Sequence, residues 1–223
     1  MPFSQKSVDF LFENMLNDSK LWYQEHKEDY KEYVVRPFTE LILGLAPAMH
    51  NIDPELMCNP KKLSRLYRDA RYSRGKSIFR DDVWYSFANR RELGRPTPEF
   101  YFDISPRGFE YGCGFYYMDS ATLDCMRGMI LDGDKLFKRA LKAYEKQSVF
   151  ELGGDMYKRN HYPEQSEKLC GWLNRKSIYF FCRSNDFETL FSADLTDKLA
   201  AEFTSIADVY GFLFAAVEKS RTD

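Results

Sequence analysis

Six cationic side chains lie within the segment Leu63–Asp82, which holds only three acidic ones. An arginine binds a carboxylate or phosphate through paired hydrogen bonds, a lysine adds a point charge, and a serine hydroxyl adds one further donor. The segment therefore predicts a pocket for a small anionic ligand, namely a phosphorylated or carboxylated metabolite. The residues that we expect to bind it are Arg65, Arg68, Arg71, Ser73 and Lys76.

Four further residues are expected to support this pocket. Alternate side chains of an extended segment share a face, so Tyr67 and Asp69 would lie together and Arg68 would face the other way. Asp69 would then hold a neighbouring guanidinium in place rather than meet the ligand. Trp22 and His26 lie four residues apart and would share one face of a helix. The supporting candidates are therefore Asp69, Trp22, His26 and Tyr67.

The same arginines admit two other interpretations. In the first, they pair with acidic side chains of the chain itself, because buried arginine–carboxylate networks form in many proteins without binding anything. The protein would then be a protein-interaction or scaffold module whose aromatic surface contacts the partner. In the second, the basic segment and the aromatic side chains bind nucleic acid. No residue pattern identifies a reaction, so the sequence leaves open whether the protein is an enzyme.

Charge is distributed unevenly along the 223-residue chain. Residues 60–100 carry 11 Lys or Arg and 5 Asp or Glu, a local charge of +6 on a chain whose net charge is −2. A local excess of this kind is typical of a discrete site. The acidic remainder argues against nucleic acid as the partner.

Several familiar chemistries lack their sequence signatures. Gly75-Lys76-Ser77 resembles the end of a phosphate-binding P-loop, but Ala70 stands where the first glycine is required. The histidines (His26, His50 and His161) are far apart, and the five cysteines form no C-x-x-C pair. We therefore expect no metal site and no cofactor. The chain also lacks the G-x-S-x-G motif of many hydrolases.

Hydrophobic periodicity places helices at both ends of the chain and strands in the middle. Helices are expected at 7–16, from residue 20 onward, at 37–50, in two pieces between 120 and 146, and from 194 toward the C-terminus. In the last helix, apolar residues recur at steps of three and four: Leu199, Phe203, Ile206, Tyr210, Leu213 and Val217. Strands are expected at 83–88, 99–104, 108–118 and 177–183, with a short helix or turn near 150–152.

Two glycines mark one face of the expected strand 108–118, which a tight turn joins to the strand before it as an antiparallel hairpin. Gly112 and Gly114 lie two residues apart, so both expose bare backbone on the same side. A helix or a ligand can approach such a surface closely. We therefore expect the anion pocket to lie under the glycine-rich face of this hairpin.

This order of elements predicts an α+β fold, with a central antiparallel sheet on which an N-terminal helical segment and a C-terminal amphipathic helix pack. We find no repeat and no linker, so we expect a single globular domain over residues 1–223. The N-terminus has no signal-peptide pattern, and no apolar run approaches the roughly 20 residues that a membrane span requires. The cysteines are scattered and odd in number, which does not favour a set of disulfides. Together, these features predict a cytoplasmic protein without membrane contact.

Three motifs resemble a bacterial family catalogued as domain of unknown function 2461. They are Asn17 with Trp22-Tyr23, His26 and Tyr30; the run Arg65-x-Tyr67-Arg68-Asp69-x-Arg71-Tyr72-Ser73-x-x-Lys76-Ser77; and Gly112-Cys113-Gly114. The likeness runs nearly end to end and implies a single-domain, cytoplasmic α+β protein, but it implies no reaction or ligand. The family usually follows a late Lys-Arg pair with prolines, whereas Lys158-Arg159 precedes Asn160-His161 here.

Overall fold

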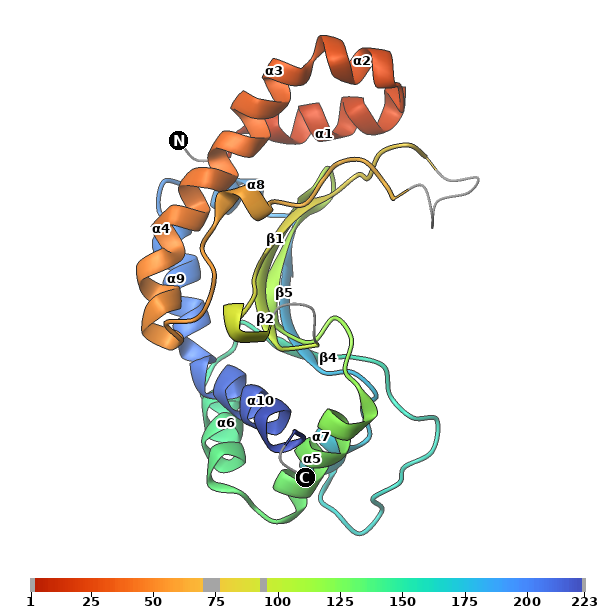
Figure 1. The fold of residues 1–223 in the computed structure, drawn as a ribbon, viewed down its shortest axis with the longest axis vertical. Helices are drawn as coiled ribbons and strands as arrows, with labels where there is room; N and C mark the ends of the chain where they lie inside the picture. Colours follow the sequence, from red (N-terminus) through yellow and green to blue (C-terminus); the bar gives the residue numbers. More distant parts are fainter. Residues whose placement is uncertain (1–2, 70–76, 93–95, 222–223) are drawn as a thin grey trace. The chain divides into compact units, whose positions relative to one another are not determined.

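The computed structural model describes residues 3–69, 77–92 and 96–221, and it confirms the α+β class (Figure 1). Within these residues five strands form one antiparallel sheet in the order β1-β2-β3-β5-β4. The strands are β1 (Val83–Phe87), β2 (Glu99–Ser105), β3 (Gly108–Gly114), β4 (Glu151–Gly153) and β5 (Tyr179–Ser184).

Helices precede, interrupt and follow the strands. The N-terminal ones are α1 (Gln5–Asn17), α2 (Lys20–Glu25), α3 (Lys27–Tyr30), the π-helical turn η1 (Lys31–Val35) and α4 (Arg36–Ile52). Two 3-10 turns follow, η2 (Pro60–Lys62) and η3 (Arg90–Glu92). The later helices are α5 (Ser120–Leu131), α6 (Lys135–Lys146), α7 (Glu167–Leu173), α8 (Phe187–Phe191), α9 (Leu195–Ser205) and α10 (Ala207–Lys219).

The chain forms two compact units, each of which is described by itself. Unit 1 comprises Met1–Phe87, Tyr101–Tyr111 and Arg183–Ala200. Unit 2 comprises Ala88–Phe100, Gly112–Cys182 and Ala201–Asp223. The expectation of a single domain over residues 1–223 is not tested by this division and stays a prediction.

In unit 1, strand β2 alternates between a buried face and a half-buried one. Phe102 and Ile104 are buried, and the Phe102 ring contacts Phe3 and Phe38 at centroid distances of 5.8 and 5.9 Å. The N-terminal segment and α4 therefore pack against the apolar face of this strand. Asp103 lies on the opposite, half-buried face, where polar side chains gather.

In unit 2, α10 packs against α6 and α5, and these helices lie together in Figure 1. Aromatic side chains fill the contact, since the Phe137 ring lies 5.3 Å from that of Phe212 and 5.4 Å from that of Trp172. Phe100 on β2 contacts Phe203 and the Tyr210 ring, each at 5.2 Å. The expected packing of C-terminal helices on the sheet is thus observed.

The C-terminal helix predicted as one piece is two. α9 and α10 meet at a bend of 54°, where Ile206 leaves the helical conformation with φ −111° and ψ 17°. All six residues of the predicted apolar stripe are nonetheless buried: Leu199, Phe203, Ile206, Tyr210, Leu213 and Val217. The bend keeps the same side chains in the core, so the spacing of apolar residues is unchanged across it. The hydrophobic pattern therefore could not reveal the break.

The end of β3 and the conformation of the chain near residue 151 also differ from the prediction. β3 ends at Gly114, whose φ of 151° only glycine adopts readily, and the exposed Tyr116 and Tyr117 lie beyond it. A short helix or turn was expected near residues 150–152, but residues 151–153 form β4 and pair antiparallel with β5. A strand of three residues is too short to display a period of two, so its neighbour decides its conformation.

No single helix in the described part of the chain is long and apolar enough to cross a membrane. The bent pair α9 and α10 meets the length and composition requirement, but its apolar stripe is the buried one described above.

Candidate functional site

The described part of the basic segment forms an antiparallel hairpin in unit 1. Tyr67 pairs with Phe79 across it, and the Arg68 N–H donates to the Ile78 carbonyl at 2.9 Å. On the other side of this pair, the Arg80 N–H donates to the Leu66 carbonyl at 2.8 Å. Extended backbone is therefore present at Arg68. Three predicted ligand-binding residues, Arg71, Ser73 and Lys76, lie outside the described residues.

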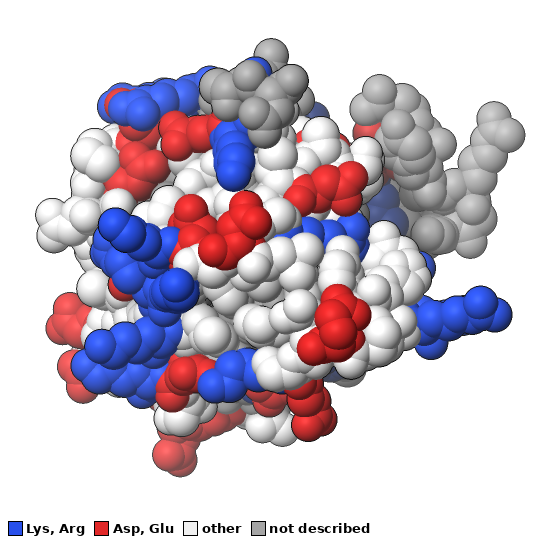
Figure 2. Space-filling view, turned by 90° about the horizontal axis from the view of Figure 1, so that it is seen from below, with Lys and Arg blue, Asp and Glu red and all other residues white. Residues whose placement is uncertain are grey.

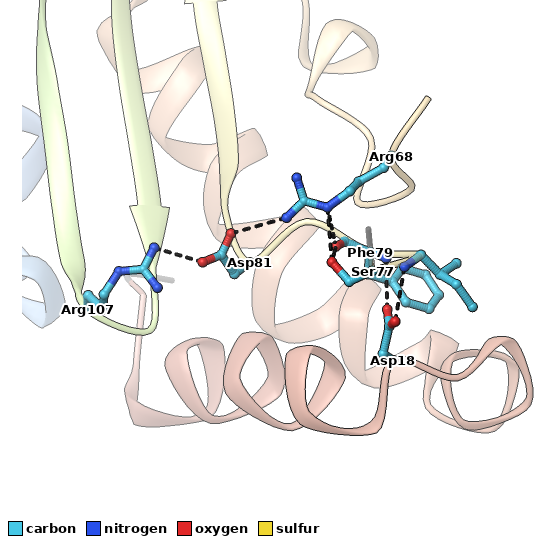
Figure 3. Close-up of polar contacts among 7 residues, drawn as sticks. Asp18, Arg68, Ser77, Phe79, Asp81 and Arg107 are labelled. Atoms are coloured by element: carbon cyan, nitrogen blue, oxygen red, sulfur yellow. Dashed lines mark hydrogen bonds and ion pairs between the residues drawn. The ribbon is translucent and has the colours of Figure 1, made fainter. Parts of the chain in front are cut away.

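Asp18 fastens this hairpin to the end of α1 (Figure 3). Its carboxylate accepts hydrogen bonds from the backbone N–H groups of Ile78 and Phe79 at 3.1 and 3.0 Å. Asp18 has φ 41° and ψ 39°, the left-handed conformation that turns the chain at the end of the helix. Asp tolerates this conformation better than most residues. These hydrogen bonds thus hold the hairpin against the C-terminal end of α1.

Asp81 lies between two guanidinium groups, as Figure 3 shows. Its Oδ2 accepts from Arg107 Nη2 at 2.7 Å, and its Oδ1 lies 3.7 Å from Arg68 Nη2. Arg68 Nε also donates to the Phe79 carbonyl at 2.8 Å and to Ser77 Oγ at 3.1 Å. Arg68 is therefore held by its own chain, and Asp81 positions its guanidinium, while the same role for Asp69 stays a prediction.

The pKa of Asp81 reflects these neighbours. Burial raises the pKa of the carboxyl, but the hydrogen bond and charge of Arg107 and the charge of Arg68 outweigh burial, so the pKa is lowered. Asp81 is therefore an anion that neutralises part of the arginine charge.

A second pair of carboxyls lies near Asp81. Burial, and then the negative charges of Asp82 and Glu110, raise the pKa of Asp103 to about 8. A hydrogen bond between the Asp103 and Asp82 carboxyls adds to this effect, and such a bond requires a proton. Burial and the charge of Asp81 likewise raise the pKa of Asp82. The pair thus holds a proton near neutral pH, where it could act as an acid or a base.

Glu110 on β3 anchors the far side of this polar face. Its Oε1 accepts from the Tyr101 hydroxyl at 2.7 Å, and its Oε2 accepts from Arg183 Nε at 2.8 Å. Arg80 lies over the Trp84 ring at 4.5 Å, and its buried Nε has no hydrogen-bond partner in the described structure. Four arginines and four carboxylic acids therefore meet in this part of unit 1: Arg68, Arg80, Arg107, Arg183, Asp81, Asp82, Asp103 and Glu110.

The chain's family follows from a family-model match over most of its length. The model of DUF2461, described as a conserved hypothetical protein, matches residues 6–212. The chain belongs to the DUF2461 family. No curated protein matches the chain. The family match confirms the resemblance drawn from the sequence motifs and assigns no ligand to the polar face.

The other described residues that we predicted for the anion pocket of this DUF2461 protein differ in their exposure and contacts. Arg65 is exposed, and Asp69 is half-buried. Tyr67 packs on Tyr23 and Phe79 at centroid distances of 5.4 and 4.6 Å, so it is part of an aromatic cluster. Its role in the described structure is packing of the hairpin against α2.

Trp22 and His26 contact each other rather than the arginines. Their rings stack at 4.1 Å, and His26 Nδ1 lies 2.8 Å from the Trp22 carbonyl oxygen. Phe10 on α1 packs on Trp22 at 5.6 Å. In the described structure no contact joins these two residues to Arg68 or Asp81. The neighbouring Tyr23, which we had not selected, is the α2 residue that meets the hairpin.

The glycine backbone of β3 is approached closely by β5, its neighbour in the sheet, and the prediction that an anion pocket lies under this face of the hairpin is not tested and stays a prediction. A Cβ at Gly112 would lie 2.0 Å from the Phe180 carbonyl oxygen, and one at Gly114 would lie 2.3 Å from Tyr179 Cα. The bare backbone permits close approach of β5. Sequence alone identified the close approach correctly but not the element that makes it.

The DUF2461 chain carried signals for the residues that we missed. Asp103 and Glu110 alternate with buried apolar positions on their strands, and this alternation was the signal that could have predicted a polar sheet face. Arg107 occupies the turn between those strands. Among the described residues, no three His, Cys, Asp or Glu side chains are arranged to hold a metal ion.

Proposed function

We propose that this DUF2461 protein binds a small phosphorylated or carboxylated metabolite at the guanidinium groups around Asp81. The observation that carries the proposal is that one carboxylate contacts both Arg68 and Arg107, which come from separate segments. Because Asp81 holds both groups in place, less side-chain freedom is lost when an anion binds.

Donor groups for an anion are left over at this position. An arginine side chain carries five N–H donors, and the described side-chain contact of Arg107 involves Nη2 alone. Its side chain is 70% exposed, so the other N–H groups face solvent or a ligand. Arg65, which lies three residues before Arg68 in the basic segment, is exposed as well. These groups support paired hydrogen bonds to a carboxylate or phosphate.

The acidic neighbours restrict the ligand's charge. Four carboxylic acids lie beside four arginines here, and one proton is held by the Asp82–Asp103 pair, so a highly charged anion would meet repulsion from that pair and Glu110 as well as attraction. The proton held between Asp82 and Asp103 lowers that repulsion and supplies a possible hydrogen-bond donor. A ligand with one or two negative charges and further hydrogen-bonding groups fits these surroundings best.

A thermal-shift series with phosphate, sulfate and succinate tests the proposal. We expect at least one anion to raise Tm by about 2 °C or more at saturation. Arg107→Gln should abolish that rise but should change the ligand-free Tm little, because exposed ion pairs contribute at most about 1 kcal/mol. Arg36→Gln is the matched control, since Arg36 is an exposed arginine of unit 1 that pairs with Glu32 and Glu40.

The scaffold alternative is supported by a different observation. Arg68 is satisfied by internal partners, and apolar side chains on α1 and α2 are exposed: Phe12 (46%), Leu16 (65%) and Leu21 (70%). Under this alternative no anion raises Tm, and Arg68→Ala lowers the ligand-free Tm without altering any response to anions. An anion-dependent rise in the wild type that Arg107→Gln removes would exclude it.

A further inference from the structure

Helix α6 in unit 2 carries a stripe of positive charge that the proposed function does not use. Its sequence, KLFKRALKAYEK, contains five cations and one acid. The cations recur at helical steps of three and four, and with a rise of 1.5 Å per residue they span about 16 Å along one side of the helix. They are Lys135, Lys138, Arg139, Lys142 and Lys146.

Acidic side chains of the same unit neutralise only one cation of the stripe. Arg139 pairs with Asp208 at 2.6 Å, and Glu145, the one acid of α6, pairs with Lys168 outside the helix. None of the four lysines of the stripe has an ion pair among the described residues. Like charges one turn apart destabilise a helix, so the stripe is not an arrangement that folding itself favours.

A hollow beside the stripe enlarges the surface open to a partner. It has a volume of about 610 Å³ and lies between α6 and the junction of α9 with α10. Its charged lining consists of Arg139, Lys142, Lys146 and Asp208. In Figure 2, Lys and Arg gather on the left of the face, the side where α6 lies in Figure 1, with acidic side chains beside them.

The apolar face of α6 is already occupied. Phe137 and Ala140 are buried, and Phe137 packs on Trp172 and Phe212. A basic amphipathic helix enters a membrane interface through its apolar face, so this helix cannot enter one while unit 2 stays folded. What α6 offers to a partner is charge and hydrogen-bond donors.

Contrary to the expectation from the acidic remainder of the chain, we infer that the stripe and hollow of α6 form a docking surface for the phosphodiester backbone of a nucleic acid. The cations of the stripe are spread over about 16 Å, so a single small anion would contact only one or two of them. A polyanion can contact all of them at once. Successive phosphates of a nucleic acid provide such a row of charges, and lysine and arginine neutralise them without reading bases. The surface is therefore expected to bind independently of sequence.

Fluorescence anisotropy with a labelled duplex of about 20 base pairs tests the inference. At about 50 mM salt we expect binding, with a slope of log K against log salt of about −3 to −4 for three or four neutralised phosphates. Lys142→Glu/Lys146→Glu should weaken binding about tenfold or more and make the slope shallower. The control is Lys158→Glu/Arg159→Glu, which makes the same charge change at exposed positions of unit 2 and should retain binding.

Three outcomes would overturn the inference. They are absence of binding at low salt, equal weakening by the two double variants, and binding to anionic phosphatidylserine vesicles in place of DNA. Near-ultraviolet circular dichroism of each variant checks that the aromatic packing of unit 2 is intact. Arg107→Gln should bind the duplex as the wild type does, so failure of this inference and failure of the small-anion proposal are separable.

Discussion

At the scale of single residues, Asp103 should make the protein less stable as pH rises. The pKa of Asp103 is about 8 in the folded chain and 3.8 ordinarily, so between these values the folded state holds a proton that the unfolded state has released. The stabilisation from this bound proton is fully present below the ordinary pKa of 3.8 and is lost as the pH rises to the folded-state pKa of about 8. The free energy of unfolding should therefore fall by up to about 1.4 kcal/mol per pH unit in this range.

Urea unfolding at several pH values between 5 and about 8 measures this dependence. Asp103→Asn should flatten it and should be more stable than the wild type near pH 8, because the amide carries no charge beside Asp82 and Glu110. Asp124→Asn is the control, since Asp124 is 74% exposed and should leave the slope unchanged. A slope in Asp103→Asn equal to that of the wild type would contradict the assigned burial of a proton.

Asp18 allows a second test at this scale, because it joins an unusual backbone conformation to two hydrogen bonds. Asp18→Ala should destabilise the protein by about 2–3 kcal/mol, since it leaves two N–H groups without their acceptor and places alanine in the left-handed region. Asp18→Gly loses the same hydrogen bonds but adopts that conformation freely, so it should be about 1 kcal/mol more stable than Asp18→Ala. Equal losses in urea unfolding would show that the backbone conformation contributes nothing.

At the scale of elements, the close approach of β3 and β5 depends on glycine. In Gly112→Ala the new Cβ would meet the Phe180 carbonyl oxygen at 2.0 Å, so backbone must shift, and we expect a loss of about 2 kcal/mol or more. Gly128→Ala on α5 is the matched control, because apart from neighbouring backbone of its own helix nothing lies within 4 Å of its new Cβ. That variant should gain roughly 0.5–1 kcal/mol from helix propensity, and thermal unfolding of both variants checks the opposite signs.

Elements also show where sequence patterns sufficed. Alternation predicted β2 and the hairpin to β3, and the 3.6-residue period predicted the buried stripe of the C-terminus, because each pattern reports which side of an element is apolar. The bend at Ile206 and the strand β4 escaped prediction. A bend that conserves the buried face leaves the period intact, and a three-residue strand forms because β5 offers its backbone hydrogen bonds.

At the scale of the whole molecule, a chain of net charge −2 contains two groups of cationic side chains. One surrounds Asp81 in unit 1 and is balanced by carboxylates, whereas the stripe on α6 in unit 2 is mostly unbalanced. The two proposals therefore predict independent effects: Arg107→Gln should lose the response to small anions and keep duplex binding, and Lys142→Glu/Lys146→Glu should do the reverse. Parallel thermal-shift and anisotropy measurements on both variants check this, and loss of both activities in either variant would contradict the assignment of separate sites.

The sequence by itself determined the α+β class, the family, the faces of most strands and helices, and the concentration of arginine near residue 68. All of these are properties of local order along the chain, which periodicity and motif spacing record directly. Only the tertiary structure decided that Asp81 and Arg107 accompany Arg68, that Asp103 is buried beside Asp82, and that β5 lies close against the glycines of β3. These depend on which distant segments meet, because burial and charge act through space rather than along the chain.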